Sequence, residues 1–261
     1  MQLFPQMNYI QCISAGQSYR MSYMAWGEQI PGGKTLICVH GLNRNCRDWD
    51  FVANHFAGLG YYVVAPDIVG RGNSDYLKNW IGYNIPTYVA DILYMIKTLG
   101  LENIDYIGTS MGGVIGMSIA AMPLHPINKL VLNDIGAEVE IKGLERISAY
   151  SEITPDFATL EEAKQHLIGV SESFAIPSEL EDFYTLVSFQ KNANGRYELK
   201  RDKNISLASK MTMVHRKNIE LWEVWKKVTL DTLVIHGVTS DILSGSTVER
   251  MKEVNPKTRS I

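Results

Sequence analysis

The sequence predicts an α/β fold, in which a mostly parallel sheet carries helices on both of its faces. Two observations favour this class. Short apolar runs rich in branched residues recur along the chain, and segments of helical length separate them. Such runs are typical of strands that are covered on both faces, because a strand with one face in water alternates apolar and polar residues.

The first segment of the chain differs from the later ones. Residues 8–13 and 17–26 mix polar residues with aromatics and methionines in near alternation, which predicts an antiparallel hairpin at a sheet edge. A last strand is expected to begin at 258–261 and to be incomplete, after an amphipathic helix at 246–255 that Pro256 ends. The apolar strands between these ends are predicted at 35–39, 62–65, 104–107, 130–132 and 232–235.

An insertion interrupts this alternation of strands and helices. About a hundred residues without a clear buried strand separate Leu132 from Thr232, which is far more than one crossover needs. Charged and aromatic residues alternate from 138 to 204, as in amphipathic helices that place an apolar face on a neighbour. We therefore expect a core of residues 1–137 and 205–261, and a helical cap of residues 138–204 over the carboxyl edge of the sheet.

Composition excludes several classes of partner. The 261 residues are 46% hydrophobic and 20% charged, which suffices for a sizeable core. A net charge of -3 without long runs of one sign predicts neither a nucleic-acid nor a membrane partner. No signal peptide or membrane span is predicted, so we expect a cytoplasmic protein. Cys12, Cys38 and Cys46 are too irregularly spaced for a disulfide framework or a zinc site, and we expect them to be packing residues.

One short segment, G-T-S-M-G at residues 108–112, carries a specific chemical signal. It matches G-x-S-x-G between an apolar strand and an apolar helix, so Ser110 is expected on a strained turn from which its hydroxyl projects. Glycines two residues to either side prevent clashes there. The sequence therefore predicts Ser110 as a nucleophile, and the helix that follows favours a developing negative charge. A serine that merely occupies a glycine-rich turn is the alternative.

A second loop, V-H-G-L-N-R-N at residues 39–45, closes another buried strand with a glycine turn. Such a loop can direct a backbone N–H group into the cleft. We expect the N–H groups of Leu42 and Met111 to form an oxyanion hole, in which each donor typically contributes ~3 kcal/mol at the transition state.

Several other residues of this loop have two alternative roles. Gly41 and Asn43 are candidate substrate-binding residues, although Asn43 and Arg44 are equally suited to bracing the loop. His40 is expected to support the loop by hydrogen bonding, and its use as the base is the alternative.

Five motifs, in order, resemble the α/β-hydrolase fold superfamily, and most closely its branch of serine esterases and C–C-bond hydrolases. They are H-G-L-N-R-N-C-R-D-W-D, G-Y-Y-V-V-A-P-D-I-V-G-R-G-N-S-D, I-G-T-S-M-G-G, L-V-L-N-D-I-G and L-V-I-H-G-V-T-S-D-I-L. The resemblance covers nearly the whole chain outside the cap and is much less specific for substrate than for fold. It implies a Ser, Asp, His triad in that chain order.

The resemblance also assigns roles to several acidic residues. Asp241, in T-S-D-I-L, lies on the loop after the penultimate strand and is implied as the acid that orients the imidazole. Asp134 is the alternative, because some members of the superfamily place the acid after the preceding strand. Asp67, Arg71 and Asp75 match a turn that the family uses structurally, with glycines that permit the bend.

The sequence departs from the family pattern at the base. The triad's histidine is expected after the last strand, yet none of the six histidines follows Asp241. We expect the chain to be truncated relative to a full-length enzyme. Two alternatives stay open: His236 or His215 substitutes, or the chain is a non-catalytic binder. Loss of one triad member costs on the order of 10⁴ to 10⁶ in turnover, with a residual rate from the oxyanion hole.

These features predict a serine hydrolase that cleaves a small or medium carboxylic ester through an acyl-enzyme, without metal or cofactor. The serine argues against haloalkane dehalogenases and epoxide hydrolases, relatives whose nucleophile is an aspartate. Hydrolysis of a carbon–carbon bond in a diketone-type substrate and acyl transfer are alternatives that use the same triad. A small-molecule binding protein of the same fold is an alternative from a different class. The oligomeric state is not predicted.

Overall fold

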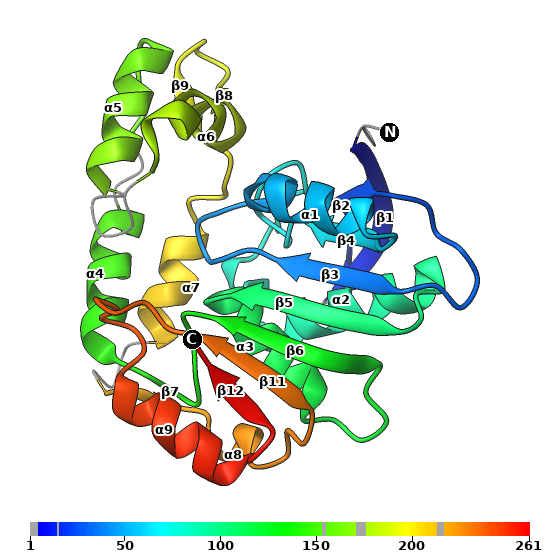
Figure 1. Ribbon diagram of the computed structural model, residues 1–261. Coiled ribbons are helices and arrows are strands. Elements are labelled where there is room, and N and C mark those ends of the chain that lie inside the picture. Colours follow the sequence, from blue (N-terminus) through cyan, green and yellow to red (C-terminus); the bar gives the residue numbers. More distant parts are fainter. Residues whose placement is uncertain (1–4, 15, 153–154, 171–175, 213–216) are drawn as a thin grey trace.

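The central element of the protein is an eight-stranded sheet with the strand order β1-β2-β4-β3-β5-β6-β11-β12 (Figure 1). The architecture is seen in a computed structural model that describes residues 5–14, 16–152, 155–170, 176–212 and 217–261. The strands are β1 (Gln6–Ser14), β2 (Gln17–Trp26), β3 (Thr35–Val39), β4 (Tyr62–Pro66), β5 (Ile104–Thr109), β6 (Ile127–Asn133), β11 (Asp231–Ile235) and β12 (Thr258–Ser260).

The directions of the strands confirm the predicted fold class. β1 and β2 form an antiparallel hairpin at one edge, and β2 runs antiparallel to β4. Every other neighbouring pair is parallel. The predicted hairpin and the five predicted apolar strands are all present, with ends that differ by up to three residues.

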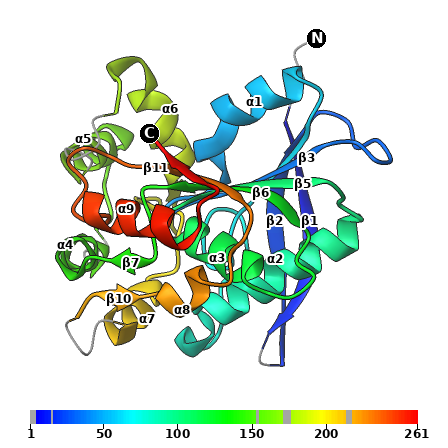
Figure 2. The same cartoon turned by 60° about the horizontal axis from the view of Figure 1, so that its bottom comes forward.

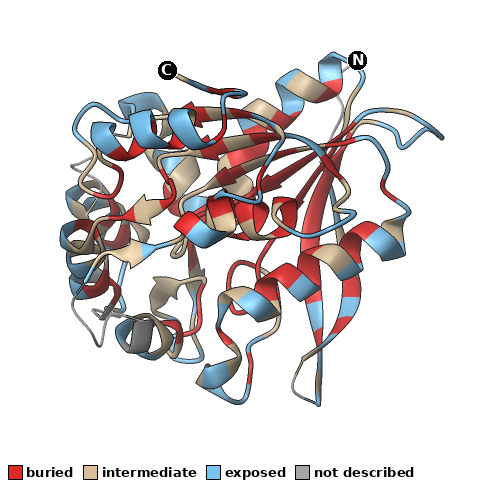
Figure 3. Ribbon diagram, turned by 90° about the horizontal axis from the view of Figure 1, so that it is seen from below, coloured by how far each residue is buried: buried red, intermediate tan, exposed pale blue. Residues whose placement is uncertain are grey.

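Helices cover both faces of the sheet (Figure 2). They are α1 (Asp50–Gly58), α2 (Ile85–Leu99), α3 (Met111–Ala120), α8 (Trp222–Trp225) and α9 (Gly245–Val254), with short 3-10 helices at Cys46–Trp49 and Trp80–Gly82. Along β3, Leu36 and Cys38 pack in the cluster with α1, and Ile37 and Val39 pack in the cluster with α2 and α3. Both faces of β3 are therefore core, which explains its mostly apolar sequence. Figure 3 shows that the strands in the middle of the molecule are largely buried between the helices.

The inserted residues lie beyond the carboxyl ends of the parallel strands (Figure 1). They form helices α4 (Ile141–Glu152), α5 (Leu160–Val170) and α6 (Glu181–Ser188), with a 3-10 turn at Ser178–Leu180. Helix α7 (Ile205–Thr212) follows.

The inserted region also brings short strands to the structure, which the sequence did not predict. β8 (Phe189–Lys191) pairs with β9 (Tyr197–Leu199), and β7 (Glu138–Val139) pairs with β10 (Ile219–Glu220). The turn between β8 and β9 ends in Gly195, whose φ of 75° suits glycine and allows the chain to reverse. Strands of two or three residues are too short to leave a periodic signal in the sequence.

Two further expectations concern the cysteines and membrane spans. Cys12, Cys38 and Cys46 are buried and form no disulfide, in line with their predicted packing role. No helix in the described ranges is long and apolar enough to cross a bilayer.

Candidate active site

Ser110 occupies the turn between β5 and α3. Its backbone has φ 49° and ψ -113°, a strained conformation that L-residues rarely adopt. Such a conformation persists only where surrounding contacts hold it. The N–H group of Ser110 donates to the carbonyl of Asn133 at 3.0 Å, while its carbonyl accepts from Gly113 and Val114 of α3 at 2.9 and 3.1 Å. The strained turn is thus held from both sides, by the neighbouring strand β6 and by the first turn of the helix.

The glycines around Ser110 allow backbones to approach each other. A Cβ atom on Gly108 would lie closer than 3.0 Å to the backbone of Gly112 and Gly113, so β5 and α3 meet without side chains between them. A Cβ atom on Gly112 would overlap the carbonyl of Val39 at the end of β3. At Gly108 and Gly112 there is therefore no room for a side chain larger than a hydrogen atom, which is the reason for glycine at both positions.

The loop of residues 40–45 runs beside this turn. A Cβ atom on Gly41 would lie 3.9 Å from Cβ of Ser110 and 3.8 Å from the carbonyl oxygen of Thr109. The structure therefore brings together two segments that are about seventy residues apart in the sequence. This is the arrangement in which an N–H of the loop and the N–H of Met111 can face one substrate oxygen.

The hydrogen bonds of Gly41 set the direction of the Leu42 N–H group. The carbonyl of Gly41 accepts from Nδ1 of His40 at 2.7 Å and from the N–H of Arg44 at 3.2 Å. This peptide bond is trans, as are all those described, so its C=O and N–H groups point in opposite directions. The N–H of Leu42 consequently points away from His40 and Arg44.

His40 supports the loop with both of its ring nitrogens. Nε2 accepts from the N–H of Ile68 at 3.0 Å, so the proton of the neutral ring lies on Nδ1 and is donated to Gly41. The side chain is completely buried, and burial lowers the pKa of His40. A buried neutral histidine with both nitrogens engaged has none left for Ser110.

Three consecutive residues of the loop contact the inserted region. Nδ2 of Asn43 donates to Oγ of Ser151 on α4 at 2.6 Å, and Oδ1 of Asn43 accepts from Arg201 at 3.2 Å. Nη1 of Arg44 donates to Oγ of Ser188 at 3.0 Å. Nδ2 of Asn45 donates to the carbonyl of Val187 at 2.9 Å. The side-chain amide of Asn43, a candidate substrate contact, is thus engaged by protein groups on both of its ends.

Asp241 lies on the loop after β11, where the family pattern places the acid. Its carboxylate accepts from Nε and Nη2 of Arg146 on α4 at 2.6 and 2.7 Å. These two bonds hold the pKa of Asp241 below its usual range, and the carboxylate is ionised at neutral pH. In this structure the hydrogen-bond donor to the Asp241 carboxylate is thus Arg146 of the inserted region, at the place where the family pattern expects a histidine.

Asp134, the alternative acid, lies at the end of β6 in a left-handed conformation with φ 51°. Its carboxylate accepts from the hydroxyl of Ser240 at 3.0 Å and from the N–H of Gly237 at 3.3 Å. Asp134 therefore braces the loop that carries Asp241.

The remaining histidine candidates do not contact Ser110 in the described ranges. Nε2 of His236 lies 3.0 Å from the carbonyl of Leu243, so this ring also braces the loop before α9. His215 lies outside the described residues.

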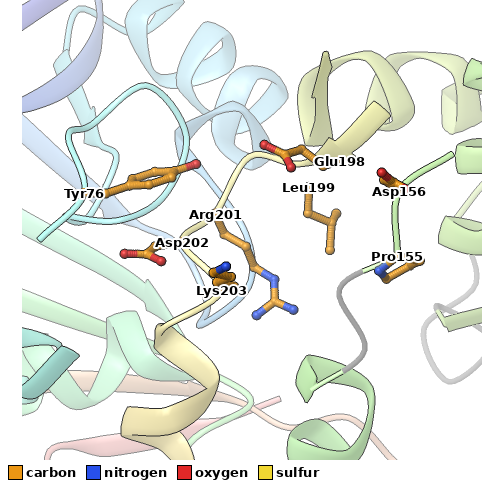
Figure 4. Close-up of a pocket in the computed structure, with 8 residues that line it drawn as sticks. All are labelled: Tyr76, Pro155, Asp156, Glu198, Leu199, Arg201, Asp202 and Lys203. Atoms are coloured by element: carbon orange, nitrogen blue, oxygen red, sulfur yellow. The ribbon is translucent and has the colours of Figure 1, made fainter. Parts of the chain in front are cut away.

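A cavity of about 410 Å³ lies where the inserted region meets the core (Figure 4). Its lining combines both signs of charge and includes neither Ser110 nor Asp241. The lining residues are Tyr76, Pro155, Asp156, Glu198, Leu199, Arg201, Asp202 and Lys203. Arg201 links this cavity to the loop beside Ser110, because its guanidinium also donates to Asn43.

Comparison with known proteins identifies the fold family. Residues 34–175 match the family model of the alpha/beta hydrolase fold. The chain belongs to this family. The family assignment agrees with the resemblance found in the sequence.

Three relatives illustrate the relationship. A 3-hydroxybutyrate-oligomer hydrolase of Cupriavidus necator is 35% identical over 95% of this chain and 86% of its own. A protein of Rickettsia typhi described as a hydrolase is 32% identical, with a TM-score of 0.88 over 98% of this chain and 90% of its own. An alpha/beta hydrolase of Novosphingobium aromaticivorans is 28% identical, with a TM-score of 0.83 over 98% of this chain and 89% of its own. This chain is accordingly a hydrolase of the α/β fold.

Sequence reasoning missed two arginines near the site. Arg146 could not be connected to Asp241, because the two are 95 residues apart and meet only through the packing of α4. Arg71 was expected only to shape a turn, yet it is completely buried and bonded to the carbonyl of Leu42. The signal available for Arg71 was its position between two glycines, in G-R-G, after a buried strand.

Proposed function

We propose that this protein is a serine hydrolase that cleaves small or medium carboxylic esters through an acyl-enzyme, with Ser110 as the nucleophile. One observation carries this proposal. Ser110 occupies a strained turn at φ 49°, at the start of α3 and beside the Gly41 turn. A hydroxyl presented between two backbone donors is suited to attack on a carbonyl, because the donors face the oxygen on which negative charge develops.

The proposed reaction has two covalent steps. In the first, a base takes the proton of the Ser110 hydroxyl as Oγ forms a bond to the carbonyl carbon, and the carbonyl electron pair moves to the oxygen between the N–H groups of Leu42 and Met111. The pair returns as the bond to the alcohol oxygen breaks, and the alcohol leaves with the proton that the base gives back. In the second step, water attacks the acyl-enzyme by the same route and releases the carboxylic acid.

Asp241 is the proposed acid, because it is ionised and lies on the loop after β11. We do not assign His40 as the base, since both of its ring nitrogens bond to the backbone, whereas the described bond of His236 is made by Nε2 alone. A base added to the solution gives a direct test of proton transfer, and His215 and His236 are the histidines to replace in parallel.

Esters of short hydroxy acids are the proposed substrate class. The support is the 3-hydroxybutyrate-oligomer hydrolase of Cupriavidus necator, which is 35% identical over 95% of this chain. We also propose that residues 138–204 form a cap over the site, since Asn43, Arg44 and Asn45 beside Ser110 hydrogen-bond to this region.

The test is turnover of p-nitrophenyl butyrate and of the linear dimer of 3-hydroxybutyrate, with and without imidazole. Ser110→Ala is expected to abolish turnover of both. Ser118→Ala is the matched control, because Ser118 lies on the same helix and its hydroxyl only donates to the carbonyl of Val114. A rate that rises with the concentration of unprotonated imidazole would indicate that no histidine of the chain serves as the base. Loss of activity in His215→Ala would identify His215 as that base.

Other outcomes would favour the alternative functions. Faster turnover of a diketone than of any ester would indicate a C–C-bond hydrolase, and transfer of the butyryl group to an added alcohol would indicate an acyltransferase. Turnover that Ser110→Ala leaves unchanged would contradict the proposed nucleophile. Reversible ligand binding in that variant, without turnover by the unmutated chain at any imidazole concentration, would indicate a binding protein.

A further inference from the structure

Arg71 is a completely buried arginine on the turn after β4. Its guanidinium donates from Nε to the carbonyl of Leu42 at 3.0 Å, and from Nη1 to the carbonyl of Val69 and the hydroxyl of Tyr88, each at 2.9 Å. Nη2 lies 3.6 Å from the sulfur of Met111. The guanidinium therefore contacts both residues whose N–H groups form the proposed oxyanion hole.

Neutral groups, namely backbone carbonyls, a hydroxyl and aromatic rings, surround the guanidinium of Arg71. Within the part of the chain that the structure describes, Arg71 forms no ion pair. Its guanidinium instead lies over the ring of Tyr88, 4.9 Å from the centroid, and 5.8 Å from that of Tyr83. A buried cation without a carboxylate is unfavourable unless carbonyl dipoles and aromatic faces replace its hydration.

The bonds of Arg71 and His40 fix two successive carbonyls of the loop. His40 holds the carbonyl of Gly41, and Arg71 holds the carbonyl of Leu42. With both carbonyls fixed, the peptide planes on either side of the Leu42 Cα atom have little freedom to rotate. The N–H of Leu42 belongs to the first of these planes.

The cover over Arg71 comes from the segment that leaves the inserted region. Arg71 and Arg201 form an antiparallel bridge, the N–H of Gly72 donates to the carbonyl of Lys200, and the N–H of Asp202 donates to the carbonyl of Gly70, the last two at 2.8 Å. This backbone pairing seals the turn and excludes water from the guanidinium. The interactions of Arg71 are therefore stronger than those of an exposed arginine.

We propose that Arg71 is a positioning residue of the oxyanion hole: by holding the Leu42 carbonyl it fixes, together with His40, the peptide planes on both sides of Leu42, so that the Leu42 N–H faces the reacting oxygen. This inference rests on the proposed function of Ser110, Leu42 and Met111. It assigns to Arg71 an effect on the transition state that is larger than its effect on substrate binding.

Arg71→Met removes the charge and keeps a long side chain, and Arg71→Lys keeps a charge but cannot reach all three oxygen acceptors. Because one oxyanion donor is worth about 10² to 10³ in rate, we expect Arg71→Met to lose about tenfold to a hundredfold in kcat for p-nitrophenyl butyrate, with KM within about twofold. Affinity for phenylboronic acid, which forms a tetrahedral adduct with a serine, should fall in parallel. Arg71→Lys is expected to lie between the two chains in both measurements.

Two further variants complete the test. Arg20→Met is the matched control, because Arg20 pairs with Asp75 at the surface beside this turn, and it should leave kcat and boronate affinity unchanged. Tyr88→Phe removes one acceptor of the guanidinium and keeps the ring. We expect Tyr88→Phe to weaken boronate binding by about threefold. If Arg71→Met does not fold, this variant tests the role of Arg71, and unchanged boronate binding would contradict that role.

The ¹H–¹⁵N resonance of Leu42 separates this inference from the proposed function. We expect this amide resonance to shift in Arg71→Met, whether or not the chain turns over an ester. A folded Arg71→Met variant with an unshifted Leu42 amide and wild-type kcat would overturn the role of Arg71, as would a loss confined to KM. A shifted Leu42 amide in a chain that Ser110→Ala leaves equally active would instead support the positioning of the loop and contradict the nucleophile.

Discussion

The substitution Gly112→Ala tests whether the close approach of α3 and β3 builds the site. An added Cβ atom would lie 2.7 Å from the carbonyl carbon of Val39 and nearer still to its oxygen, whereas ordinary contact begins near 3.4 Å. The start of α3 must therefore move by about 1 Å, because the nearer carbonyl oxygen sets the required shift. The obstacle is backbone, which cannot turn aside as a flexible side chain does.

This displacement has a consequence for stability and another for chemistry. Overpacking against a rigid neighbour destabilises proteins by about 1–3 kcal/mol. For a chain of this size, that loss lowers the unfolding midpoint by roughly 3–10 °C. Because Ser110 and Met111 directly precede Gly112, a shift of about 1 Å should reduce the rate of ester hydrolysis by about 10²-fold.

The assay combines thermal unfolding with turnover of p-nitrophenyl butyrate. Gly169→Ala is the matched control, because Gly169 lies in the last turn of helix α5 and no atom of the described residues lies within 4 Å of an added Cβ. It should leave turnover unchanged and raise stability by up to about 0.5–1 kcal/mol, since alanine favours the helix over glycine. A Gly112→Ala variant with the wild-type midpoint and rate would refute the tight contact between α3 and β3.

Three further predictions follow from buried or paired side chains. Burial raises the pKa of Asp91 to about 6, so the folded protein binds a proton more readily than the unfolded chain, and stability should fall by about 3 kcal/mol as the pH rises from 4 to 7. In Asp91→Asn, the free energy of unfolding measured with urea should not fall with pH in this way. An unchanged dependence on pH in that variant would contradict the raised pKa of Asp91. Arg146→Leu should return the pKa of Asp241 to its usual range, which NMR of the carboxyl resonances as a function of pH would record. The ion pair should contribute well under 1 kcal/mol of stability, because both side chains are partly exposed, and this contribution should be present above pH 4 and lost below it. A pKa of Asp241 that stays low in the variant would mean that another group stabilises this carboxylate. Asn43→Ala removes the bond to Ser151 and should lower the unfolding midpoint by roughly 2–4 °C for about 1 kcal/mol, and an unchanged midpoint would show that this bond does not stabilise the contact.

Local patterns predicted the sheet and the turn at Ser110 well. The run T-L-I-C-V is buried on both faces, and the sequence G-T-S-M-G forms the strained turn between β5 and α3. Both features depend on residues that are adjacent in the chain, where strand propensity, glycine spacing and helix start act together. The family resemblance then placed these segments in order.

The contacts that decide the behaviour of the site are long-range, and single-sequence patterns do not contain them. Arg146 meets Asp241 across 95 residues, and Asn43 meets Ser151 across 108. Arg71 lies 29 residues from Leu42, and its place between two glycines indicates a turn but does not name the loop that its guanidinium holds. These partners depend on how the inserted region packs against the core, which is set by the fold as a whole.

Covalent labelling of Ser110 tests the central claim most directly. The chain is treated with a fluorophosphonate, digested and analysed by peptide mass spectrometry, with Ser110→Ala and Ser118→Ala treated alongside. We predict one adduct on the peptide that contains Ser110, present in Ser118→Ala and absent in Ser110→Ala. An adduct of equal yield in folded Ser110→Ala, or none in the folded unmutated chain with imidazole present, would contradict the account of this protein as a serine hydrolase.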